Sequence, residues 1–251
     1  MSSDFSSFVG RTARRIAPLA VVAGLVPGAM AQTLCNSDGV PPPRVLQERF
    51  LDADCSGCWS GAPGGAATAA VAAHPSGAAA ATRMLTLDWI VPSASAAVAA
   101  AMSAAALPEA QTRLDALHRT APSAQATLQA SAPVGPARPG ALRVARGAAV
   151  SDYVGVSIAW SPPRSTTGPV TAWLVLAEAL PAGAEGSAVE RLLVRGALTL
   201  RWQPQAGAKQ SDSRSMRLPE TADPARLRMV GWVEDAGGRI LAAAASVCRP
   251  S

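Results

Sequence analysis

Two cysteines separated by two residues, in the run Cys55-Ser56-Gly57-Cys58, most constrain what this chain can fold into. The run follows a hydrophobic stretch, Val45 to Leu51, that has the length of a strand. Cysteines at this spacing fit the first turn of a helix, where free backbone N–H groups and the helix dipole stabilise a thiolate on the first of them. The motif therefore predicts a corner between a strand and a helix that carries thiol–disulfide chemistry.

The N-terminus has the three parts of a secretory signal peptide, namely a basic region, a short apolar run and a small-x-small cleavage sequence. They are Arg11, Arg14 and Arg15, then Ile16 to Val26, then Ala29-Met30-Ala31. We predict that residues 1–31 are a signal peptide, that no membrane span is left after its cleavage, and that the mature protein is periplasmic or secreted by a bacterium. An uncleaved membrane anchor and a lipid-bearing Cys35 are the alternatives.

The chain contains four cysteines, a number that fits export to an oxidising compartment. Four cysteines allow three pairings. We favour Cys55–Cys58 together with a structural disulfide between Cys35 and Cys248, which would close a loop over most of the chain and restrict the unfolded state. The alternative is that Cys35 and Cys248 are two free structural thiols.

Changes in composition divide the mature chain into three parts. Residues 32–43 are a lead-in that ends in three prolines, and residues 44–140 hold the cysteine motif and Ala-rich stretches that favour helix. Residues 141–251 alternate between apolar and polar side chains. A loop rich in proline and glycine, residues 131–140, marks the boundary between the last two parts.

Hydrophobic periodicity predicts the main elements of both parts. Before residue 140 we expect two strands and a helix: Arg44 to Leu51, Thr82 to Val91, and Leu107 to Thr120. After it we expect at least five strands: Tyr153 to Trp160, Thr171 to Ala177, Arg191 to Trp202, Arg226 to Glu234, and Ile240 to Val247. The compact turn Asp235-Ala236-Gly237-Gly238 predicts that the last two form a hairpin, and the set predicts a small antiparallel β-sandwich. We interpret its tryptophans as core and rim packing rather than ligand stacking.

Five segments, in this order, carry a resemblance to a known family: Val45 to Cys58, Thr86 to Trp89, Leu107 to Arg119, Glu190 to Arg195, and Val230 to Ala245. Together they resemble the secreted thioredoxin-like bacterial family called domain of unknown function 1223. The resemblance implies an α+β fold, with a thioredoxin-like α/β domain over residues 44–140 followed by a small antiparallel β-sandwich over residues 141–251. It also implies an unidentified protein thiol or disulfide as the partner.

The chain departs from that family at two places. Trp59 stands where the family usually has proline after the second cysteine. The family's cis-proline, which faces the cysteine pair, has three candidates here: Pro133, Pro136 and Pro139.

Thiol chemistry assigns Cys55 as the more exposed, attacking thiolate and Cys58 as the cysteine that resolves the mixed disulfide. We interpret Asp52 and Asp54 as solvated loop acids beside the motif. Asp88 is either a buried proton acceptor behind the cysteines or, more simply, a structural cap or surface acid.

Three functions compete at this point. The first is an exported thiol–disulfide oxidoreductase or redox sensor, and the second is a non-catalytic binding or structural module in which Cys55–Cys58 is a structural disulfide. The third, a metal site, has only His74 and His118 to complete it, and both fit surface or packing positions better. We predict no cofactor. The chain has a net charge of +5 but contains no run of basic residues interleaved with aromatic residues, so its sequence does not predict nucleic-acid binding.

Overall fold

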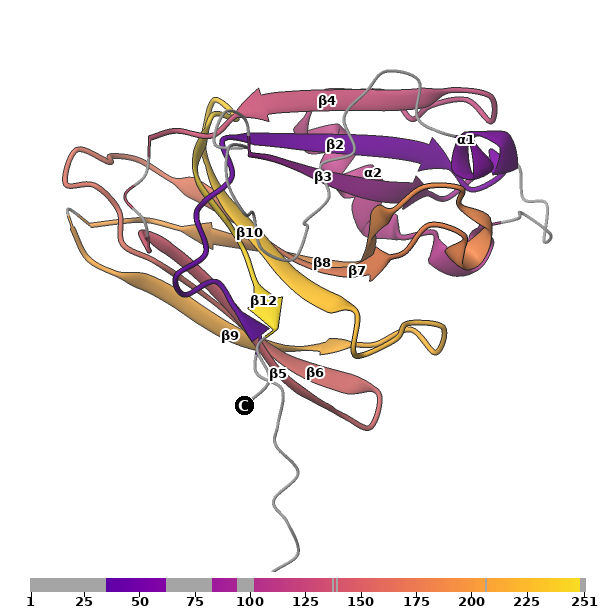
Figure 1. The fold of residues 1–251 in the computed structure, drawn as a ribbon. Coiled ribbons are helices and arrows are strands. Elements are labelled where there is room, and N and C mark those ends of the chain that lie inside the picture. Colours follow the sequence, from indigo (N-terminus) through magenta and orange to yellow (C-terminus); the bar gives the residue numbers. More distant parts are fainter. Residues whose placement is uncertain are drawn as a thin grey trace, which may run out of the picture. The chain divides into compact units, whose positions relative to one another are not determined.

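Strands make up about half of the residues that the structure, a computed structural model, describes (Figure 1). The structure describes residues 35–61, 83–93, 102–136, 138, 140–205 and 207–248, all of which lie in one unit that spans residues 31–251. The predicted signal peptide and the Ala-rich stretch 62–82 lie outside these residues. Within the described ranges, no helix is both long and apolar enough to cross a membrane.

The described residues form twelve strands and two α-helices, with 3-10 turns at Ser103–Ala105 and Ala184–Gly186. The helices are α1 (Ser56–Ser60) and α2 (Pro108–Ala116). The strands are β1 (Cys35–Asn36), β2 (Val45–Asp52), β3 (Met84–Val91), β4 (Thr127–Pro133), β5 (Leu142–Val150), β6 (Tyr153–Trp160), β7 (Val170–Leu180), β8 (Arg191–Trp202), β9 (Gln210–Arg217), β10 (Leu227–Asp235), β11 (Ile240–Ala245) and β12 (Val247–Cys248).

These strands form two sheets. The five-stranded sheet is antiparallel and has the order β12-β1-β5-β6-β9. The seven-stranded sheet has the order β11-β10-β7-β8-β3-β2-β4 and is mixed, because β3 runs parallel to both β2 and β8. Parallel neighbours need a crossover connection rather than a tight turn. The C-terminal end of β2 leads into α1 (Figure 1).

Each face of the seven-stranded sheet packs into its own core. Alternate residues of β7, such as Leu174 and Leu176, pack with Val144, Ile158 and other side chains of the five-stranded sheet. The residues between them, such as Trp173, face the opposite side and pack with β3 and with α2. A third, smaller cluster surrounds Trp59 beneath α1. The sheet is therefore covered on both faces, as its nearly continuous apolar strands require.

The predicted fold class is wrong. The structure is mostly β, and it is not a thioredoxin-like α/β domain followed by a small β-sandwich. Strands β2, β3 and β4 come from the first half of the chain, and they join β7, β8, β10 and β11 from the second half in one sheet, through the pairing of Asp88 with Leu193. The physical reason is burial: Trp89 of β3 enters the same core as Trp173 and Trp232 of the second half.

Most of the predicted elements are confirmed as local structure. The structure contains β6 and β8 with the predicted bounds, β2, β3, α2 and β7 with shifted ends, and the β10–β11 hairpin. The four tryptophans of the second half, at positions 160, 173, 202 and 232, are all buried in the cores, which confirms their interpretation as packing residues. The predicted loop at residues 131–140 instead begins with the last three residues of β4, and β5 and β9 were not predicted.

Candidate functional site

The cysteine motif lies where the sequence predicts it, at the corner between β2 and α1. Asp52 ends β2, and its carbonyl accepts the N–H of Cys55 at 2.9 Å while its side chain accepts the N–H of Asp54 at 2.8 Å. Cys55 is the N-cap of α1, and its Sγ accepts the N–H of Cys58 at 3.3 Å. Asp52 is buried rather than solvated, so it shapes this turn instead of placing a free charge beside it.

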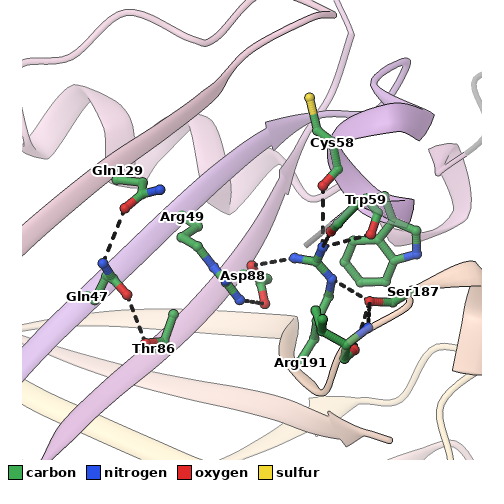
Figure 2. Close-up of polar contacts among 11 residues, drawn as sticks. Gln47, Arg49, Cys58, Trp59, Thr86, Asp88, Gln129, Ser187 and Arg191 are labelled. Atoms are coloured by element: carbon green, nitrogen blue, oxygen red, sulfur yellow. Dashed lines mark hydrogen bonds and ion pairs between the residues drawn. The ribbon is translucent and has the colours of Figure 1, made fainter. Parts of the chain in front are cut away.

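Cys55 and Cys58 are joined by a disulfide. Cys55 is only 4% exposed, and Cys58 is the more exposed residue of the two. The Cys58 sulfur lies on the side of the turn away from the buried charges behind it (Figure 2). This order of exposure is the reverse of the predicted one, in which Cys55 is the more exposed cysteine.

Arg191, the first residue of β8, connects the cysteine turn to the sheet (Figure 2). Its Nη2 donates to three carbonyls at the end of α1: Cys58 at 3.3 Å, Trp59 at 2.7 Å and Gly61 at 3.1 Å. Its Nε donates to the Ser187 hydroxyl at 2.7 Å. Because the last carbonyls of a helix have no partner within it, this one guanidinium satisfies most of the free end of α1.

Asp88 lies behind Arg191 in the middle of β3 and is 0% exposed. One of its oxygens is 2.6 Å from Nη2 of Arg49, and the other is 3.3 Å from Nη1 of Arg191. Burial raises the pKa of Asp88, although both ion pairs act in the opposite direction. Burial also lowers the pKa of Arg191, and the nearby charge of Arg49 lowers it further, although the ion pair with Asp88 acts in the opposite direction.

This placement removes two of the roles considered for Asp88, since it is neither a surface acid nor a helix cap. Both of its oxygens bind arginines, so it meets the cysteine turn through Arg191. The triad of Arg49, Asp88 and Arg191 therefore positions the turn, and it gives the buried side of the motif a net positive charge.

Trp59 fills the space under the turn. The residue is 5% exposed, its indole N–H donates to the carbonyl of Glu185 at 2.7 Å, and its ring centroid lies 4.5 Å from the guanidinium carbon of Arg191. The position at which the resembled family has proline is thus taken by a side chain that packs on Arg191. The cysteine turn is therefore packed on its inner side by the buried Trp59 ring and the Arg191 guanidinium.

A second buried charge cluster fixes α2 on the sheet, at a distance from the motif. Arg113 of α2 forms a two-pronged bond with Glu48, and it also binds Glu234 at 2.7 Å. Its guanidinium carbon lies about 5 Å from the rings of both Trp173 and Trp232. Burial raises the pKa of Glu48, Arg113 acts in the opposite direction, and the charge of Glu234 adds a smaller upward effect.

Other predicted site residues are not brought to the motif. Pro133 pairs with Val45, at the opposite end of β2 from the cysteines, and the described residues contain no cis peptide bond. Pro139 and His74 lie outside the described residues. His118 follows α2 with a φ of +53°, and the part of the chain that the structure covers holds no cluster of metal-binding side chains.

Cys35 and Cys248 form the second disulfide, as the favoured pairing has it. They face each other across β1 and β12, in the five-stranded sheet. Two disulfides in one chain fit an oxidising compartment.

Comparisons with known proteins supply no family. No family model matches the chain, and no curated protein matches it. Among solved structures, HBP35 of Porphyromonas gingivalis is 8% identical with a TM-score of 0.48, covering 83% of this chain and 75% of its own. A structural-genomics protein of Agrobacterium tumefaciens is 10% identical with a TM-score of 0.40, covering 83% and 94%.

An endonuclease/exonuclease/phosphatase from Beutenbergia cavernae is 13% identical with a TM-score of 0.29, covering 50% of this chain and 31% of its own. All of these scores are too low to carry an inference about fold or function. Membership of the domain of unknown function 1223 family therefore stays a prediction.

Proposed function

We propose that this is an exported protein in which Cys55 and Cys58 perform thiol–disulfide exchange with a protein partner. The observation that carries the proposal is the disulfide itself, formed across one helical turn with one accessible residue, Cys58, and one sheltered residue, Cys55, that accepts a backbone hydrogen bond. An exchange pair needs this asymmetry, because one sulfur must be attacked and the other must leave.

The exchange begins when a partner thiolate attacks the Sγ of Cys58. The bond between Cys55 and Cys58 breaks, its electron pair leaves on the Sγ of Cys55, and a mixed disulfide joins the partner to Cys58. The N–H of Cys58 is placed to stabilise the new thiolate on Cys55. A second partner thiolate then attacks the partner sulfur of the mixed disulfide and releases Cys58, which leaves an oxidised partner and a reduced pair.

Arg191 contributes by holding the turn still. Three carbonyls bound to one guanidinium keep α1 in place whether the cysteines are joined or apart, so little reorganisation accompanies each step. The positive charge of the triad behind the turn also favours a thiolate over a thiol on the pair.

One observation favours a second candidate, a non-catalytic module with a structural disulfide. Cys55 is as deeply buried as Trp59, the core tryptophan of the same helical turn. A buried, well-packed disulfide resists reduction while the protein stays folded, and in that case the function would lie elsewhere on the two sheets.

A site-resolved redox titration separates the two candidates. The protein is equilibrated in dithiothreitol buffers of graded potential, alkylated and digested with trypsin, and the peptide from Phe50 to Arg83 reports the pair alone. Exchange predicts reversible reduction of the folded protein at roughly −120 to −270 mV. Reduction only in denaturant would assign the disulfide to structure.

The two cysteine-to-serine variants are each other's matched control. With Cys55→Ser, the free Cys58 thiolate should attack an added disulfide-linked peptide dimer, keep one peptide as a mixed disulfide and release the other as a thiol. With Cys58→Ser, the sheltered Cys55 should trap the peptide slowly or not at all. Equal trapping by both variants would contradict the assigned roles. Mass spectrometry of the protein exported by a bacterial host tests the location, since cleavage after Ala31 leaves Gln32 as the first residue.

A further inference from the structure

Two arginines converge on the disulfide between β1 and β12. Arg228 Nη1 lies 3.0 Å from the Sγ of Cys248, and Arg146 Nη2 lies 3.6 Å from the same atom. Arg146 lies on β5 of the five-stranded sheet, where it pairs with Cys35, and Arg228 lies on β10 of the seven-stranded sheet, so the two guanidiniums approach the disulfide from different sheets.

Neither arginine has a carboxylate partner among the described residues. Arg146 donates its other bonds to the carbonyls of Leu227, Gly147 and Pro224, and Arg228 donates to those of Ala225 and Leu227. Arg146 is only 4% exposed. Burial lowers the pKa of both arginines, and the charge of Arg228 lowers that of Arg146 further. Within the part of the chain that the structure describes, two cations are thus held together around one sulfur without an anion.

The missing anion is supplied when the disulfide is opened, because a thiolate on Cys248 would sit between both guanidiniums. We propose that Cys35–Cys248 is a second exchange site, at which a small thiol that carries a carboxylate forms a mixed disulfide with Cys248. The two guanidiniums favour a thiol that carries negative charge of its own. It does not depend on any activity of Cys55 and Cys58.

Accessibility and charge set the order of the steps. Cys35 is 0% exposed, whereas Cys248 is partly exposed. The incoming thiolate therefore attacks the Sγ of Cys248, the bond to Cys35 breaks, and its electron pair leaves on Cys35, which takes up a proton from water. A second small thiolate attacks the small-thiol sulfur of the mixed disulfide and forms a small-molecule disulfide. The electron pair then leaves on Cys248, whose thiolate is neutralised by Arg228 and Arg146.

The arginines act twice in this sequence. They attract an anionic thiol to Cys248, and they stabilise the thiolate that leaves in the second step. A cationic thiol of the same size gains nothing from the first effect and is repelled.

The test uses three thiols of similar size and different charge: thioglycolate, 2-mercaptoethanol and cysteamine. The folded protein is exposed to each, quenched by alkylation and digested with trypsin, and the peptide that begins at Ile240 reports Cys248 alone. After division by thiolate fraction, thioglycolate should modify Cys248 at least about tenfold faster than cysteamine, which is the effect of one favourable charge contact near a protein surface. Equal rates, or no modification of the folded protein, would overturn the proposal.

Arg228→Gln should abolish most of the preference for thioglycolate. It should also raise the pKa of the reduced Cys248 thiol, which is measured from the pH dependence of its reaction with iodoacetamide. Arg143→Gln is the matched control. Arg143 lies on β5, in the same sheet as the disulfide, but it pairs with Asp38 at 2.7 Å instead of with a cysteine. A preference that survives Arg228→Gln, or one that Arg143→Gln removes equally, would refute the role of the arginine pair. The readout is independent of the Phe50–Arg83 peptide, so failure here and failure of the Cys55–Cys58 proposal are separate results.

Discussion

Replacing Arg191 by methionine tests whether this arginine holds the cysteine turn in place. The change removes three bonds to the carbonyls at the end of α1, one bond to the Ser187 hydroxyl and one ion pair with Asp88. Asp88 keeps Arg49, and the Ser187 hydroxyl keeps its bonds to Val189. A lost bond to a charged donor costs about 1.5–3 kcal/mol when the acceptor stays buried. Among the three carbonyl bonds, only the one to Trp59 is fully buried, whereas the carbonyls of Cys58 and Gly61 can turn to water.

The buried carbonyl, the weakened triad and the relief of burying one cation combine to a loss of about 3 kcal/mol in the free energy of unfolding. For a chain of this size, with a urea slope near 3 kcal/mol/M, that loss lowers the midpoint of urea unfolding by about 1 M. The measurement is made on the oxidised protein by tryptophan fluorescence, because Trp59 packs directly on Arg191.

Two further variants make the result decisive. Arg191→Lys keeps the charge but not the planar fork that reaches several acceptors at once, so we expect most of the loss to remain. Arg201→Met is the matched control, since Arg201 lies on the same strand and is exposed, and it should change stability by no more than about 0.5 kcal/mol. If Arg191→Lys behaves like the wild type, or Arg191→Met like Arg201→Met, the hydrogen-bonding argument is refuted.

Three other changes have defined outcomes. Replacing both Cys35 and Cys248 by alanine removes a cross-link between residues 213 apart and should lower stability by about 5 kcal/mol in urea unfolding, and a loss below about 1 kcal/mol would mean that the bond hardly restricts the unfolded chain. Gly231→Ala places a Cβ 2.6 Å from Val144, where the two sheets meet, and should cost about 1–3 kcal/mol by thermal unfolding, whereas an unchanged midpoint would show that the sheets can separate freely. Burial raises the pKa of Glu48 above 4.5, so its contribution to stability is present below that pH and is lost as the pH rises through the raised pKa. The free energy of unfolding of Glu48→Gln should therefore increase relative to that of the wild type as the pH rises. If this difference decreases instead, the ion pair with Arg113 outweighs burial.

Local structure was largely predictable from the sequence, and its long-range pairing was not. Alternation over Tyr153 to Trp160 and over Arg191 to Trp202 predicts β6 and β8 within their actual bounds. Strand β9 escaped prediction because it is an edge strand, with the polar sequence Gln-Ser-Asp-Ser-Arg-Ser and little to bury. The pairing of Asp88 with Leu193 joins the two halves into one sheet. It involves strands about a hundred residues apart, and no local sequence pattern predicts it.

The site divides in the same way. Spacing alone locates Cys55 and Cys58, because the chemistry of the pair depends on neighbours along the chain. The sequence places Arg191 in a strand that resembles a family motif but does not predict that this arginine binds the cysteine turn. A charged residue at the start of an apolar strand was the available signal, since a buried arginine needs several acceptors around it.

The disulfide between Cys35 and Cys248 also changes what a broken backbone means for this molecule. The bond joins the first and last strands of the described chain, so the polypeptide between them is a closed covalent ring. A protease that cuts once in the exposed loop 161–169 between β6 and β7 opens the ring but frees no fragment. The nicked protein keeps its full mass under oxidising conditions and separates into two pieces only when the disulfide is reduced, so reduction converts a tolerated cut into a loss of half of the fold.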